Sequence, residues 1–142
     1  MEKFTAKVNE IIAKIKVIIA NTPDTTYEYN TQDINDNKWQ GLLAYIGPFC
    51  LVPILLNLFG GKKSKYGMYH ANQGLNLLII DLIGKYVLAG IFGKIPHIGW
   101  IFRIANVLVI LASCRMVLMG VLNVVAGKAK ELPFIGKIKL IK

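Results

Sequence analysis

The chain has 142 residues and a net charge of +9, with 54% apolar and only 18% charged residues. With a mean hydropathy of +0.48, it carries too little charge to cover a small soluble domain, for which about 25% charged residues is typical. The lysines gather beside apolar blocks and form no stripe with aromatic residues. The composition therefore argues against nucleic-acid binding and favours contact with anionic lipid headgroups.

Residues 1–20 are predicted to form an amphipathic helix. Apolar residues recur at helical spacing, at Phe4, Val8, Ile11, Ile12, Ile15, Ile18 and Ile19. The opposite face carries charges, at Lys3, Lys7, Glu10 and Lys14. The segment is too short and too rich in lysine to span a bilayer, so it either lies on a membrane surface or packs on a partner helix.

Residues 21–38 are predicted to be a polar linker, because Pro, Thr, Asn and Asp dominate them without a visible period. Asp33 or Asp36 is placed to cap the helix that follows.

Three apolar blocks are long enough to cross a membrane as helices: Gly41–Phe59, Ala71–Phe92 and Gly99–Ala126. The first begins near Trp39, and its two prolines, Pro48 and Pro53, are expected to kink it. The last two are joined by a short connection and form an antiparallel hairpin. The predicted fold is thus all-α: an integral membrane helical bundle with three transmembrane helices in residues 39–127, and a basic tail over residues 128–142 that lies in the interface.

Charged residues inside the last two blocks are the first candidates for function. Asp81, with Lys85 one turn on, lies near the middle of the second block, and Arg115 near the middle of the third. Counted from the hairpin turn, Asp81 and Arg115 differ in depth by about 6 Å. An unpaired charge at the bilayer centre costs roughly 2.5–3.5 kcal/mol. The sequence predicts an ion pair of Asp81 with Arg115 or Lys85; the alternative is a polar pathway or a substrate-facing cavity.

Small or polar residues fall every seven positions along the third block, at Gly99, Asn106, Ser113, Gly120 and Gly127. Seven residues differ from two full turns by only about 20°, so these residues form one stripe. Such a stripe is typical of a helix–helix contact face in membranes. Chance spacing in a glycine-rich chain is the alternative.

A second polar group lies at the start of the second block, at His70, Asn72, Gln73 and Asn76. These side chains either cap the helix at headgroup depth or form a polar vestibule with a recognition role. A metal site is not expected, because His70 and His97 lie at opposite ends of one span and no cysteine or acidic cluster joins either.

Enzyme chemistry is not expected from this sequence. It contains no Ser/His/Asp grouping, no phosphate-binding loop and no dinucleotide-binding glycine motif. No cofactor is implied. Cys50 and Cys114 belong to no C-x-x-C pair, and they are either buried thiols or a disulfide across two spans.

Lysine distribution predicts the topology. With three spans, eight lysines share one side: Lys62, Lys63, Lys65, Lys128, Lys130, Lys137, Lys139 and Lys142. Only Lys38 and Lys94 flank the spans on the other side. The positive-inside rule then places the tail in the cytoplasm of a multi-pass protein of the inner (plasma) membrane.

Several phrases together resemble a known family: N-T-P-D-T-T at 21–26, D-N-K-W-Q-G-L-L-A-Y-I-G at 36–47, S-K-Y-G-M-Y-H-A-N-Q-G-L at 64–75 and G-K-A-K-E-L-P-F-I-G-K-I-K-L at 127–140. The chain is similar over residues 21–142 to small bacterial membrane proteins of undefined role, grouped with the channel-forming subunit of the chloroplast inner-envelope protein-import translocon. The resemblance implies a helical membrane domain and a part in moving polypeptides or protecting the membrane. Relatives often carry a zinc ribbon before the linker, where this chain has its amphipathic helix, so no zinc is implied.

The expected function is therefore that of a non-enzymatic membrane component of a protein or peptide translocation or transport assembly. The alternative is a bacteriocin-immunity or envelope-stress protein that binds a membrane-active peptide. Three short spans cannot enclose a wide pore, so a homo-oligomer or a membrane partner protein is expected. The other expected partners are an anionic bilayer and, in either role, a peptide, but no nucleic acid.

Overall fold

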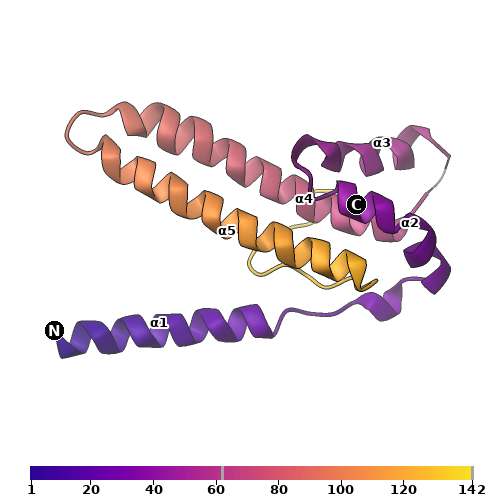
Figure 1. Cartoon of the computed structure of the whole chain (residues 1–142), viewed down its shortest axis with the longest axis horizontal. Helices are drawn as coiled ribbons and strands as arrows, with labels where there is room; N and C mark the ends of the chain where they lie inside the picture. Colours follow the sequence, from indigo (N-terminus) through magenta and orange to yellow (C-terminus); the bar gives the residue numbers. More distant parts are fainter. Residues whose placement is uncertain (62, 142) are drawn as a thin grey trace.

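Helices form nearly all the regular structure in this computed structural model (Figure 1). The structure describes residues 1–61 and 63–141, and at Ile19 it describes the backbone only. The α-helices are α1 (Glu2–Ala20), α2 (Thr31–Leu43), α3 (Leu51–Phe59), α4 (Lys65–Ile83) and α5 (Gly99–Val125). Shorter elements are the 3₁₀ turns η1 (Thr26–Glu28), η2 (Gly47–Cys50) and η4 (Phe92–Lys94), and the π-helix η3 (Gly84–Ile91). No strand occurs among the described residues. The predicted all-α class is confirmed.

A long hairpin runs through the molecule. α4, η3 and η4 form one helical rod, Lys65–Lys94, and the chain then turns back into α5. Both rods are long and apolar enough to cross a membrane. Their outer faces expose large apolar side chains, including Leu82, Ile91, Ile104, Leu108, Leu111, Leu118 and Leu122. A soluble monomer rarely exposes so continuous an apolar surface, so this surface is suited to lipid or to partner helices.

The predicted first span does not form as one helix. α2 ends at Leu43, Gly47 takes a left-handed φ of +49°, and Pro48 begins the short turn η2 before α3. The left-handed glycine and the missing proline N–H break the helix rather than kink it. The remaining apolar piece, Gly47–Phe59, is only about 20 Å long. The described residues therefore contain two helices of spanning length, not three.

The predicted linker is also partly helical, since α2 begins at Thr31 rather than near Trp39. Neither Asp33 nor Asp36 caps it. The cap is Asn30, whose Oδ1 accepts a hydrogen bond from the Gln32 N–H at 2.9 Å.

Asp33 instead stabilises the start of another helix. Its Oδ2 accepts from the Tyr66 N–H at 3.1 Å, in the first turn of α4. Ser64 caps the same turn by accepting from the Gly67 N–H at 2.9 Å. α2 and α4 are thereby tied together at their polar ends.

The linker, α2, α3 and the tail gather around the lysine-rich end of the hairpin. We call these segments, residues 21–59 and 127–141, the head. The head surrounds the first three turns of α4 and the last three of α5 (Figure 1). Its core consists of Ala44, Tyr45, Ala71, Leu77, Val124, Leu132 and Ile135.

The tail is a packed part of the head, not the snorkelling interfacial segment that the sequence predicts. Ala129, Leu132 and Ile135 are at most 5% exposed, while the lysines at 128, 137 and 139 stay exposed. These three apolar residues thus belong to the core of the head, whereas Phe134, Ile138 and Leu140 are exposed together with those lysines. Lys62 and Lys142, which enter the topology argument, lie outside the described residues.

α1 forms over residues Glu2–Ala20, as predicted. Figure 1 shows it projecting from the head, and its described side chains are exposed. The ion pair between Lys14 and Glu10, with Nζ and Oε1 2.6 Å apart, lies within the helix itself. The apolar face of α1 therefore has no partner in the described part of the chain.

Candidate functional site

The polar residues at the start of α4 are buried. His70, Asn72, Gln73 and Asn76 are at most 7% exposed. They do not cap α4, because Ser64 does so. The tail covers most of their surface, and Asn72 and Gln73 also line a cleft of about 680 Å³ beside the linker and the tail. Most of their hydrogen-bond partners are backbone groups more than fifty residues further along the chain.

Asn72 holds the last described residues of the tail. Its Nδ2 donates to the Ile138 carbonyl at 2.7 Å, and its Oδ1 accepts from the N–H groups of Leu140 and Ile141 at 2.7 and 3.0 Å. Asn76 donates to two tail carbonyls, those of residues 135 and 138, at 3.1 and 2.7 Å. The two side-chain amides thus supply the hydrogen bonds that a neighbouring strand would otherwise make to the tail backbone.

Gln73 fixes the middle of the tail. Its Oε1 accepts from the Leu132 N–H at 3.1 Å, and its Nε2 donates to the Lys130 carbonyl at 3.4 Å. The Tyr45 hydroxyl reaches Gln73 at 3.4 Å and His70 Nδ1 at 2.9 Å. Tyr45, between α2 and α3, thus connects this part of the chain to α4 and, through Gln73, to the tail.

Tyrosine rings surround His70. Tyr66 and Tyr69 pack edge-on against it, with centroids 4.7 and 5.2 Å away, and Tyr45 lies at 5.7 Å. Nε2 of His70 and the hydroxyl of Tyr69 are buried without a hydrogen-bond partner in the described chain. No carboxylate or nucleophile adjoins this histidine in these contacts. The described contacts of this cluster are thus ring packing and the hydrogen bond between His70 and Tyr45.

The linker closes over the tail from the other side. The Thr25 N–H donates to the Ala129 carbonyl at 3.0 Å, and the Glu131 N–H donates to the Pro23 carbonyl at 3.0 Å. Between them, Asp24 and Lys130 form an isolated β-bridge. Three of the four segments on which the predicted family resemblance is based, 21–26, 64–75 and 127–140, thus meet in one place.

Asp24 is exposed in this bridge. Hydrogen bonds from the hydroxyl and the N–H of Thr26 favour its charged form and hold the pKa of its carboxyl below the usual value. The carboxylate accordingly orders the turn at η1.

The ion pair predicted for Asp81 is wrong. Glu10–Lys14 is the only ion pair within residues 1–61 and 63–141. Asp81 lies on the face of α4 that carries the buried Gly84, three residues on, and its Oδ1 is buried without a partner. Arg115 is exposed on α5, and Lys85 is exposed beside the Tyr86 ring.

The stripe on α5 lies against the rest of the same chain. A Cβ atom on Gly99 would be 2.4 Å from the Gly93 carbonyl oxygen, and one on Gly120 would be 2.3 Å from Cε1 of Tyr45. Ser113 is 5% exposed. Gly127, with φ +69°, ends the stripe as the chain leaves α5. The contact is therefore intramolecular along most of the stripe.

Asn106, the remaining stripe residue, faces Gly84: a Cβ atom on that glycine would be 2.6 Å from Asn106 Oδ1. This oxygen is buried without a partner, as is Oδ1 of Asp81. Two buried acceptors without a described partner thus lie in the hairpin. An unsatisfied buried acceptor costs about 1–3 kcal/mol, so these groups are the clearest departure from pure packing.

Arg103 is a site residue that the sequence argument missed. Its Nε donates to the Gly93 carbonyl at 3.0 Å and closes the hairpin tip. The sequence did carry a signal for this residue: Arg103 is a cation one turn into an apolar block, and a glycine-containing turn precedes that block.

The cysteines are both free, so the disulfide alternative is wrong. Cys50 is buried, as predicted, but Cys114 is exposed on α5 next to Arg115. No group of three His, Cys, Asp or Glu side chains is placed to bind a metal ion in the part of the chain that the structure describes.

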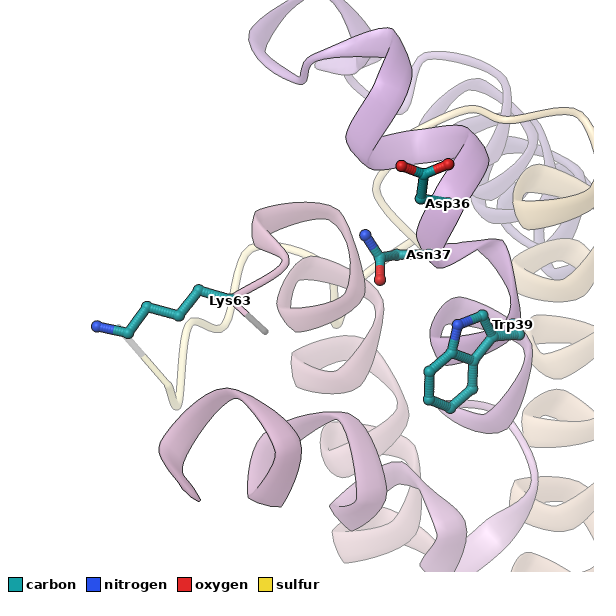
Figure 2. A pocket seen from close by; sticks show the side chains of 4 residues that line it. All are labelled: Asp36, Asn37, Trp39 and Lys63. Atoms are coloured by element: carbon teal, nitrogen blue, oxygen red, sulfur yellow. The ribbon is translucent and has the colours of Figure 1, made fainter. Parts of the chain in front are cut away.

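A cavity of about 360 Å³ lies beside α2, lined by Asp36, Asn37, Trp39 and Lys63. Figure 2 shows that these side chains do not converge: the Lys63 ammonium extends away from the other three. The arrangement therefore offers no binding constellation.

Comparison with known proteins adds no relative: no protein-family model, curated protein or solved structure matches the chain. The family resemblance in the sequence therefore stays a prediction.

Proposed function

We propose that the protein is a non-enzymatic integral membrane protein, and that it acts as one helical unit of a protein or peptide translocation assembly. The observation that carries the proposal is the hairpin. Its two rods are long and apolar enough to span a bilayer, and large apolar side chains cover their outer faces. The polar side chains of His70, Asn72, Gln73 and Asn76 on α4 are buried, so they would not face lipid at the sides of the molecule.

A single copy encloses no path through the membrane. Gly84 and Asn106 on the two rods are in contact, as are Gly93 and Gly99 near the tip, so the hairpin is closed along its axis. A conducting path therefore needs further copies or a partner protein.

Arg115 supports such an assembly. It is exposed on α5 with no partner among the described residues, and a cation facing lipid is costly. In an assembly, an acidic side chain or a water-filled path would replace lipid around it. Exposed Cys114 beside it gives a native reporter for that face.

The test is oxidative crosslinking of the full chain in native membranes. We expect a dimer that Cys114→Ser abolishes and Cys50→Ser retains, because Cys50 is buried. A protein that is monodisperse in buffer without detergent would refute the membrane assignment. A Cys114 that forms no crosslink would refute contact between copies through this face of α5.

Reconstituted protein tests transport itself. We expect ion conductance that Arg115→Gln alters. Absence of conductance, together with protection of cells against an added membrane-active peptide, would overturn the proposal in favour of the immunity alternative.

A further inference from the structure

A cleft of about 680 Å³ opens between the linker, the junction of α3 with α4, and the tail. Tyr69, Asn72 and Gln73 of the polar cluster on α4 form part of its wall. Three cationic side chains line it: Lys63, Lys65 and Lys139. Two carboxylates, Glu28 and Glu131, line it as well. Charges from three separate parts of the chain thus meet around one space.

These five charges are not paired with one another, since the single ion pair of the described chain lies in α1. The lysines and Glu28 are exposed, and Glu131 is half-buried. A cleft built only for an anion gains nothing from two carboxylates, and one built only for a cation gains nothing from three lysines. The mixture matches a ligand that carries both a positive and a negative charge.

The wall of the cleft is partly apolar. Leu58, Met68 and Ile141 line it, and Leu58 is 67% exposed. Next to it, Phe59 is 83% exposed at the end of α3. The site thus combines charged side chains of both signs with an exposed apolar edge.

We propose that this cleft binds the headgroup of an ethanolamine phospholipid. The lysines take the phosphodiester and the carboxylates of Glu28 and Glu131 take the primary ammonium, while the acyl chains lie over the apolar rim. The proposal rests on the proposed membrane setting, because the lysine-rich end of the hairpin then lies at headgroup depth.

Native mass spectrometry of the full chain in detergent tests the proposal. The protein is mixed with phosphatidylethanolamine, phosphatidylcholine and phosphatidylglycerol of identical acyl chains. We expect the ethanolamine lipid to be retained about tenfold more than the choline lipid, whose ammonium cannot donate hydrogen bonds. Free phosphoethanolamine should displace it from the unmodified protein, and inorganic phosphate at the same concentration should not.

Matched variants locate the two charges. Glu131→Gln should remove the preference for ethanolamine over choline, whereas Lys139→Gln should weaken all three lipids. Lys137→Gln is the control, because Lys137 is exposed on the same tail but does not line the cleft.

Three outcomes would overturn the proposal. Equal retention of ethanolamine and choline lipids would exclude recognition of the ammonium. A preference for phosphatidylglycerol that survives Glu131→Gln would indicate a plain phosphate site. Displacement by a peptide of mixed charge, but not by phosphoethanolamine, would indicate a peptide groove. None of these results depends on crosslinking through Cys114, so failure of the lipid site is distinguishable from failure of the proposed function.

Discussion

Replacing Asn72 by alanine is expected to free the end of the tail. The substitution removes three hydrogen bonds, to the backbone of Ile138, Leu140 and Ile141. At about 1 kcal/mol net for each bond, docking of this segment should weaken by about 3 kcal/mol. Since 1.4 kcal/mol is a factor of ten, the undocked fraction should rise roughly a hundredfold. The effect is local, because Gln73 still holds the middle of the tail.

Limited trypsin digestion in detergent, followed by intact mass, measures this opening. Lys137 precedes the held segment and Lys139 lies within it. Cleavage follows the open fraction when reclosing is fast. Asn35→Ala is the control, because Asn35 is exposed on α2 and its side chain makes no hydrogen bond in the described structure. Equal cleavage of the two variants after residues 137 and 139 would refute the claim that Asn72 secures the tail.

Two further predictions concern the helix contacts. Gly120→Ala should lower stability by about 1–3 kcal/mol, because the new Cβ atom would lie 2.3 Å from the ring of Tyr45; thermal unfolding in detergent measures it, and an unchanged midpoint would contradict the packing. Asp81→Leu and Arg115→Leu should have additive effects, because Oδ1 of Asp81 is buried and Arg115 is exposed. A double-mutant cycle that shows coupling above about 0.5 kcal/mol would restore the ion pair.

The hairpin and α1 could be predicted from the sequence because long apolar blocks and helical spacing are local signals. The break between α2 and α3 could not be predicted in the same way. It depends on Gly47 adopting a left-handed φ and on the close approach of the Ala44 carbonyl to Gly74, where a Cβ atom would lie only 1.7 Å away. A close contact between residues thirty positions apart does not appear in the periodicity of the sequence, so it could not be predicted from it.

The role of the polar residues on α4 was hidden for a related reason. Asn72, Gln73 and Asn76 stood out as polar, but the backbone groups that they bind in the tail have no side-chain signature. The ion pair of Asp81 and Arg115 failed because counting residues fixes depth but not direction around the helix. The stripe from Gly99 to Gly120 was visible because a seven-residue spacing does fix direction.

The docked tail is synthesised last, and this order affects how the protein can fold during synthesis. In the proposed membrane setting, the amides of α4 are synthesised before residues 127–141, so their partners are absent while the hairpin inserts. Until the tail arrives, water or lipid headgroups must solvate those amides, which holds that end of α4 near the bilayer surface. The head can therefore close only after translation has passed residue 141, and a ribosome stalled before that point would carry an inserted hairpin with an open, unfinished head.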